Sequence, residues 1–205
     1  MNPAKNCALC SRLVEYRRDN QTAYPDWHNG PVPSFGDLSA RYLIVGLAPG
    51  LRGANRTGRP FTGDGAGDLL YEVLLKLGLA SGTYDQRPDD GLTLKSVRIT
   101  NAVRCVPPAN KPLSAEFKNC LPFLTREIAA MPNLVGLFAV GRDAHEAVLT
   151  ALGLRKTDSP FIHGRRYDLP SGLTLTDSYH CSRYNTNTGR LTADMFEMAM
   201  KAMLT

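Results

Sequence analysis

The run Arg41-Tyr42-Leu43-Ile44-Val45-Gly46 is a short apolar stretch that ends at a glycine. Runs of this kind are typical of strands buried inside a parallel sheet, where both faces are covered. Three later stretches have a similar character and predict further strands at residues 95–103, 134–140 and 173–176. The sequence therefore predicts a parallel sheet of four strands.

Helical patterns separate these strands along the chain. Apolar residues recur at helical spacing within 66–79, and helices are also predicted at 114–130, 142–152 and 191–204. Ser114 stands where an N-cap is expected. Strands that alternate with helices indicate the α/β class, with helices on both faces of the sheet.

No linker, internal repeat or low-complexity tract divides the chain, so we predict a single domain over residues 1–205. Residues 1–40 are polar, contain Pro25, Pro31 and Pro33, and have no hydrophobic periodicity. They predict an irregular segment that wraps around the rest of the domain.

The composition is that of an ordinary globular protein, with 43% hydrophobic and 21% charged residues. This excludes a disordered or fibrous chain. No apolar run approaches the roughly 18 residues that span a bilayer. The first residues also lack the apolar stretch of an export signal. A net charge of +5 permits a polyanionic partner without identifying one.

The chain contains five cysteines, at positions 7, 10, 105, 120 and 181. An odd number of cysteines, in a chain without a visible export signal, argues against a disulfide framework. The spacing of Cys7 and Cys10 lets two thiolates reach one metal centre. Cys105 and Cys120 stand beside prolines, which we expect to hold them outside regular structure. Four thiolates suit zinc or an iron–sulfur cluster, and spacing alone does not separate the two. The alternative is a redox pair with two buried apolar thiols.

Ligands of parallel sheets bind beyond the carboxyl ends of the strands. Three loops there hold the least ordinary sequence of the chain, namely 46–67, 101–112 and 177–190. The first is rich in glycine, which lets backbone approach a ligand closely. It contains no Walker A motif and no clean dinucleotide fingerprint. The last places His180 at a strand end, followed by hydroxyls, amides and arginines that suit phosphate contacts.

Four blocks within these loops resemble one known family. They are Gly46-Leu47-Ala48-Pro49-Gly50; Asn55-Arg56-Thr57-Gly58-Arg59 with Phe61-Thr62-Gly63-Asp64; Asn101-Ala102-Val103-Arg104-Cys105; and Tyr179-His180 with Asn185-Thr186-Asn187-Thr188-Gly189-Arg190. Together they resemble the family 5 uracil-DNA glycosylases, the bacterial and archaeal iron–sulfur branch of that superfamily. The resemblance extends from Cys7 to about Arg190. It implies an α/β/α sandwich on a four-stranded parallel sheet, and a [4Fe–4S] cluster held by Cys7, Cys10, Cys105 and Cys120.

The resemblance also implies an activity: a damaged nucleotide is flipped out of DNA and its N-glycosidic bond is hydrolysed. The implied base-binding residues are Gly46, Leu47, Ala48, Phe61 and Asn101. The implied catalytic residues are Asp64, His180 and Asn101. The implied DNA-binding residues are Arg56, Ser182, Arg183, Asn187 and Arg190. Four of these residues have a plainer alternative. Phe61 could be a core residue, Asn101 a turn cap, Asp64 the N-cap of the helix that follows, and His180 an ordinary surface or core histidine.

Two departures from the family pattern matter. Related families carry a polar or acidic side chain where this chain has Leu47-Ala48-Pro49, so we hypothesise a broad slot that also accepts hypoxanthine or xanthine. Cys181 replaces a proline of the family motif, and we expect this to be neutral, with a cluster or redox role as the alternative. Lys111 is the only lysine in the three loops. A Schiff-base lyase needs a lysine at the sugar, so we expect a monofunctional enzyme.

The main alternative from another class is a non-catalytic iron–sulfur module that binds DNA during repair. A nucleotide-handling enzyme is disfavoured because no phosphate–metal motif is present. We expect a monomer of the bacterial or archaeal cytoplasm, associated with the nucleoid, whose partner is DNA with uracil or another deaminated base. The expected DNA footprint is a group of arginines: Arg52, Arg56, Arg59, Arg104, Arg183 and Arg190.

Overall fold

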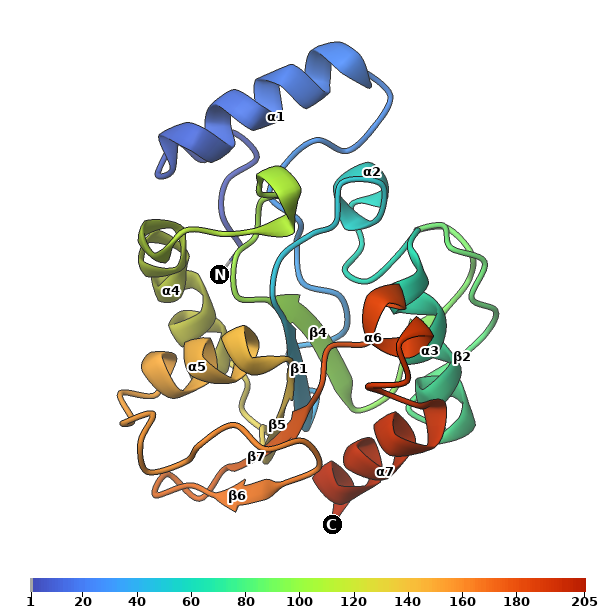
Figure 1. The fold of residues 1–205 in the computed structure, drawn as a ribbon, viewed down its shortest axis with the longest axis vertical. Helices are drawn as coiled ribbons and strands as arrows, with labels where there is room; N and C mark the ends of the chain where they lie inside the picture. Colours follow the sequence, from blue (N-terminus) through green and yellow to red (C-terminus); the bar gives the residue numbers. More distant parts are fainter. Residues whose placement is uncertain (1) are drawn as a thin grey trace.

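The computed structural model describes residues 2–205, arranged in layers about a central sheet (Figure 1). The strand order in this sheet is β4-β1-β5-β7-β6. β1 (Tyr42–Gly46), β4 (Val97–Asn101), β5 (Gly136–Val140) and β7 (Thr174–Ser178) run parallel. These are the four strands that the apolar runs predict.

β6 (Arg166–Asp168) was not predicted. It pairs antiparallel with β7 at the edge of the sheet. Arg166 and Asp168 are exposed, so no apolar run marks the strand in the sequence. Beside the main sheet, β2 (Ala80–Ser81) pairs antiparallel with β3 (Thr93–Leu94) in a short hairpin.

Helices cover both faces of the sheet, as the α/β/α prediction requires (Figure 1). α3 (Gly65–Lys76) and α7 (Ala193–Leu204) pack on the face to which Ile44 of β1 contributes. α4 (Ser114–Ala129) and α5 (Arg142–Ala151) pack on the opposite face. Side chains alternate along a strand, so one apolar run supplies both cores. No helix among residues 2–205 is long and apolar enough to cross a bilayer.

The N-terminal segment is not irregular throughout, because residues Ser11–Ala23 form helix α1. The buried face of this helix consists of Leu13, Arg17 and Asn20. Two of these three side chains are polar, and therefore no apolar period was visible in the sequence. Hydrogen bonds to other segments, rather than apolar contacts alone, hold this face of the helix. Arg17 donates to the carbonyl of Cys7, and Asn29 donates to the carbonyl of Asn20.

Two expectations about α4 were wrong. Leu113, not Ser114, is the N-cap, and the Glu116 carboxylate accepts the Leu113 N–H at 2.7 Å. Cys120 lies inside the helix rather than outside regular structure, and the helix continues through Pro122. The tertiary contacts of the buried turns beyond the proline outweigh its poor helix propensity.

The loops at the carboxyl ends of the strands contain three short helical turns. α2 (Ala54–Thr57) follows β1, η1 (Pro108–Asn110) follows β4, and α6 (Arg183–Asn187) follows β7. These turns give the loops fixed shapes and place their side chains around one opening.

A buried carboxylate joins β4 to α4. Glu127 accepts hydrogen bonds from Arg98 Nε at 2.7 Å, from Thr100 Oγ1 at 3.0 Å and from Arg104 Nη2. Arg104 Nη1 also donates to Ser34 Oγ at 2.8 Å, which ties in the N-terminal segment. Burial favours the neutral acid, but the charges of Arg104 and Arg98 outweigh it and hold the pKa of Glu127 below its ordinary value.

We expect Glu127→Gln to lower the free energy of unfolding by about 3–5 kcal/mol, because two buried guanidinium groups would lose their counter-charge. Urea unfolding at neutral pH measures this. The control is Glu146→Gln, which removes a surface pair with Lys156 and should change stability by less than about 0.5 kcal/mol. Equal effects of the two substitutions would contradict a special role for Glu127.

Candidate active site

A cavity of about 550 Å³ opens beyond the carboxyl ends of β1, β4 and β7. Its walls come from the three loops that the sequence singled out, apart from Gln86. Six of the residues predicted to bind the base or take part in catalysis line it: Leu47, Ala48, Phe61, Asp64, Asn101 and His180. The fold therefore brings together side chains that lie up to 133 positions apart in the sequence (180 − 47).

Gly46, the last residue of β1, lets two of these side chains approach each other. It is in register with Asn101 of the neighbouring strand β4. A Cβ at Gly46 would lie 2.5 Å from Asn101 Oδ1 and 2.5 Å from Phe61 Cζ. Because real contacts of that length do not occur, any larger residue here would displace the amide, the ring or both. The cavity can therefore keep this shape only if residue 46 is a glycine.

Phe61 adopts a left-handed backbone conformation, with a φ of 52°. This region is uncommon for a bulky residue and indicates local strain. The ring centroid lies 6.2 Å from that of His180, with 28° between the two planes. Phe61 is also part of the core formed with α3 and α7. Its core role and its place in the cavity wall are therefore compatible.

His180 follows the end of β7. Its carbonyl accepts a hydrogen bond from Asn185 Nδ2 at 2.7 Å, which folds the start of α6 back onto it. Burial lowers the pKa of His180, and the charges of Asp64 and Asp143 oppose this only in part. The imidazole is therefore neutral at neutral pH and can donate one hydrogen bond from its protonated nitrogen.

Asp64 has the structural role that the sequence allowed and also faces the cavity. It is the N-cap of α3, and its Oδ1 accepts the N–H of Ala66 at 3.2 Å. Its Oδ2 lies over Gly50, where a Cβ would come within 2.7 Å of it. Among the described residues that line the cavity, Asp64 is the only carboxylate. Asp68, one turn later, accepts from Gln86 and lies 3.9 Å from Arg183, as expected of a peripheral residue.

Two of the five predicted DNA-binding residues line the cavity. Ser182 and Arg183 line the cavity, and Ser182 also caps α6 by accepting the Asn185 N–H. Arg56 is exposed and donates to the carbonyls of Arg52 and Gly63. Asn187 and Arg190 are exposed but do not line the cavity, and Arg190 lies over the ring of Tyr179 at 4.7 Å.

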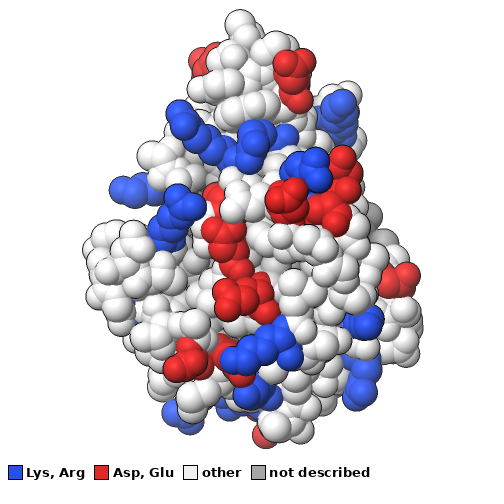
Figure 2. Space-filling view, turned by 90° about the vertical axis from the view of Figure 1, so that its right-hand side faces the viewer, with Lys and Arg blue, Asp and Glu red and all other residues white. Residues whose placement is uncertain are grey.

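Two of the six arginines expected in a DNA footprint cannot belong to one. Arg104 is 1% exposed and bound to Glu127, and Arg59 is 4% exposed and bound to Asp90. On the face shown in Figure 2, basic side chains gather in the upper part, acidic side chains run from among them down the middle, and further basic side chains lie near the bottom. The basic excess is therefore not one continuous positive surface on this face.

Three residues at or near this site were not singled out from the sequence. Gln86 and Asn110 line the cavity, and both have left-handed backbone conformations. Tyr184, next to Arg183 on α6, is 73% exposed. They come from segments without a motif, and the Pro-Pro-Ala-Asn turn that contains Asn110 is the only local signal.

The four cysteines of the predicted metal centre line one small cavity between α1 and α4. They are Cys7, Cys10 (the N-cap of α1), Cys105 and Cys120. Burial, together with the neighbouring Cys120 thiol, raises the pKa of Cys105 to about 12. Within residues 2–205, no group of three or more His, Cys, Asp or Glu side chains lies close enough to hold a single metal ion.

Arg17 provides an independent sign that this cavity suits a negatively charged group. Its side chain lines the cavity and is largely buried, and its Nη1 has no hydrogen-bond partner among the described residues. A buried, unpaired guanidinium N–H is costly unless an acceptor is present. An iron–sulfur cluster ligated by four thiolates would be such an acceptor. The four cysteine thiols and the unpaired N–H of Arg17 together fit an iron–sulfur cluster.

Cys181 lies elsewhere. It is fully buried in the core on the α3 and α7 side, and its Sγ contacts the carbonyl of Ala66 at 3.3 Å. Burial raises the pKa of this thiol far above its ordinary value. It behaves as an apolar core residue, which agrees with the neutral interpretation of the replaced proline.

Comparisons with known proteins agree with this geometry. Residues 33–204 match the family model of the uracil DNA glycosylase superfamily. The type-5 uracil-DNA glycosylase of Thermus thermophilus is 48% identical over 203 residues, covering 96% of this chain and 92% of the relative. That of Pyrobaculum aerophilum is 43% identical, covering 95% and 86%, and a type-4 enzyme of the same organism is 33% identical, covering 80% and 69%. The chain therefore belongs to the type-5 branch of the uracil-DNA glycosylase superfamily.

Proposed function

We propose that this protein is a DNA-repair glycosylase that releases uracil from DNA by hydrolysing the N-glycosidic bond. One observation carries the proposal: an aromatic ring, an amide, a neutral imidazole and a carboxylate converge on one cavity. The type-5 relatives support it through their shared sequence. The substrate is DNA, and the proposed place of action is the nucleoid.

The chemistry requires a slot for a planar base, groups that read its edge, and stabilisation of the departing base. Phe61 offers a face on which a flipped base can stack. Asn101 can both donate to and accept from a base edge. His180 can donate to the carbonyl oxygen on which charge develops as the bond breaks. Asp64 can orient water and stabilise the cationic sugar, since no other carboxylate among the described residues lines the cavity.

The proposed enzyme is monofunctional and leaves an abasic site. Among the described residues that line the cavity there is no lysine. A lyase that cleaves the strand needs an amine at the sugar carbon. The cavity offers none.

His180→Ala should lower the single-turnover rate of uracil release by about 10²–10³, the usual effect of removing one donor to a developing oxyanion. Uracil release from a uracil-containing duplex is measured by treating the DNA with alkali, which cleaves the strand at each abasic site. Without alkali the strands should stay intact. Asp168→Asn, an exposed change on β6, is the control and should be without effect.

No uracil release by wild-type protein would instead favour the non-catalytic DNA-binding module. Strand cleavage without alkali or heat would contradict the monofunctional assignment.

We also propose that the slot accepts deaminated bases other than uracil. The segment Leu47-Ala48-Pro49 in the cavity wall contributes no polar side chain to reject a larger base. Measured on single- and double-stranded DNA, excision of hypoxanthine or xanthine should reach a detectable fraction of the uracil rate. Strict selectivity for uracil across that panel would refute the broad slot.

We further propose that Cys7, Cys10, Cys105 and Cys120 hold a [4Fe–4S] cluster. Each iron of such a cluster takes its own thiolate, so the four sulfurs need not converge on one point. When bound, the cluster supplies a rigid cross-link between the N-terminal segment, the loop after β4 and α4. Arg17 lies beside it and balances its charge.

Anaerobically purified protein should show broad visible absorption and contain iron and acid-labile sulfide at about four of each per chain, as a four-iron cluster requires. Cys105→Ser should abolish the absorption. Cys181→Ala is the matched control and should retain it, because Cys181 does not line the cysteine cavity. Stoichiometric zinc without sulfide would overturn the cluster proposal.

A further inference from the structure

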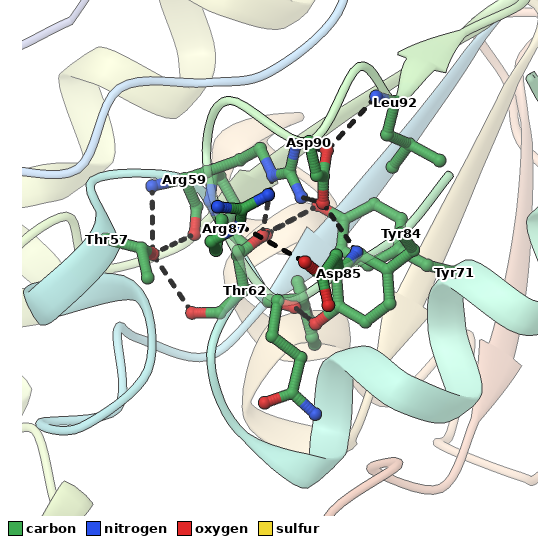
Figure 3. Close-up of polar contacts among 12 residues, drawn as sticks. Thr57, Arg59, Thr62, Tyr71, Tyr84, Asp85, Arg87, Asp90 and Leu92 are labelled. Atoms are coloured by element: carbon green, nitrogen blue, oxygen red, sulfur yellow. Dashed lines mark hydrogen bonds and ion pairs between the residues drawn. The ribbon is translucent and has the colours of Figure 1, made fainter. Parts of the chain in front are cut away.

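Arg59 looks like a DNA-binding residue in the sequence, but the structure gives it a different environment. Its Nη1 and Nη2 donate to the two carboxylate oxygens of Asp90 at 2.8 and 2.7 Å. The two side chains are 5% and 0% exposed. The guanidinium also lies 5.2, 5.4 and 5.8 Å from the ring centroids of Phe35, Tyr71 and Tyr84. Figure 3 shows Arg59 beside Asp90, with Tyr71 and Tyr84 nearby.

Asp90 extends the contact to the hairpin loop between β2 and β3. Its carboxylate also accepts the backbone N–H groups of Asp85 at 2.9 Å and Leu92 at 3.1 Å. Burial opposes ionisation, but Arg59 and these two N–H groups outweigh it and hold the pKa of Asp90 well below its ordinary value. The loop is thus fixed to Arg59 by an ionised carboxylate with four hydrogen bonds.

The same group of residues holds the backbone of Phe61 on both sides. Three successive carbonyls each accept a side-chain hydroxyl, and Arg59 Nε donates to Thr62 Oγ1 at 2.8 Å. The hydroxyl bonds run from Tyr71 to Pro60 at 2.7 Å, from Tyr84 to Phe61 at 3.3 Å and from Thr57 to Thr62 at 3.0 Å.

The clamped segment is the one with the unusual backbone. Phe61 has a φ of 52°, and a relaxed backbone would point its ring elsewhere. On the other side of the same segment, a Cβ at Gly67 would collide with the Phe61 carbonyl, so the first turn of α3 lies directly against it. The ring is therefore oriented by its backbone, and the backbone is held by hydroxyls and by Arg59.

We infer that Arg59 is a positioning residue for excision: with Asp90, Tyr71 and Tyr84 it fixes Phe61 at the angle at which its ring closes the base slot. This inference rests on the proposed stacking role of Phe61. Stability alone does not account for the arrangement, because a buried ion pair is often no more stabilising than apolar residues of the same size. What the arrangement supplies is a fixed geometry for one ring.

A double-mutant cycle tests this, with Asp90→Asn and Tyr84→Phe made singly and in a Phe61→Ala background. Tyr84→Phe keeps the ring and removes only the hydroxyl that holds the Phe61 carbonyl, so it is expected to fold. In the wild-type background we expect single-turnover uracil release to fall about tenfold for Asp90→Asn and about threefold for Tyr84→Phe. In the Phe61→Ala background the further loss should be below about twofold, since residues that act through one another are not additive.

Free uracil serves as a second probe, because a defect in ring position weakens its inhibition whereas a loss of folded protein does not. Both substitutions should raise its inhibition constant in parallel with the loss of rate, while affinity for undamaged duplex stays unchanged. The matched control is Glu197→Gln. It removes a carboxylate of α7 that pairs with Lys201 of the same helix and with Lys76 at the end of α3, away from this loop. It should leave rate and inhibition within about twofold of wild type.

Full additivity in the Phe61→Ala background, or unchanged inhibition by uracil, would overturn the inference. If Phe61→Ala itself released uracil at the wild-type rate, the stacking role of Phe61 would fail first and the inference with it. That outcome differs from the others, because it appears in the single Phe61 variant before any cycle is completed.

Discussion

The absence of one side chain at Gly46 is the constraint on which the candidate active site depends. Gly46 ends the central strand β1, and a Cβ there would lie 2.5 Å from both Phe61 and Asn101. Parallel pairing with β4 sets Asn101 beside it, and a strained backbone turns Phe61 toward it. Around this close approach the other loops supply an imidazole and a carboxylate. The cavity is thus shaped by backbone geometry first and given its chemistry by side chains second.

Charge in this protein serves two different purposes, and burial separates them. Arg59 and Arg104 are enclosed, each bound to a carboxylate, and they hold segments of backbone in place. Arg56 and Arg183 remain exposed at or near the cavity, where we propose that they contact phosphate. A guanidinium suits both purposes because its planar fork binds carboxylate and phosphate in the same bidentate way. The six arginines of the expected DNA footprint therefore overstate the basic side chains available to DNA, because two of the six are buried.

Much of the fold was predictable because its signals are local. The apolar runs predicted all four parallel strands, and the place of Asp64 before a helical pattern indicated the N-cap as one of its two candidate roles. Features without a local apolar signal were missed or misplaced. Helix α1 buries Arg17 and Asn20 through tertiary hydrogen bonds, and β6 is an exposed edge strand. The prolines beside Cys105 and Cys120 suggested positions outside regular structure, although the helix predicted over 114–130 spans Cys120. Helix α4 does continue through Pro122, because tertiary packing overrides the poor propensity of proline.

The sequence by itself determined the α/β class, the loops that carry the chemistry, and the set of residues proposed to act on the base. The class and the loops follow from residue type and spacing, which are properties of neighbours along the chain. The residue set follows from the resemblance of four sequence blocks to a known family. Only the tertiary structure decided which arginines are free, which residues from distant loops join the cavity, and what holds Phe61 in its strained conformation. These features depend on burial and on contacts between segments that are far apart in the sequence. Arg59 and Asp90, 31 positions apart, illustrate this, because neither position alone indicates the ion pair that they form.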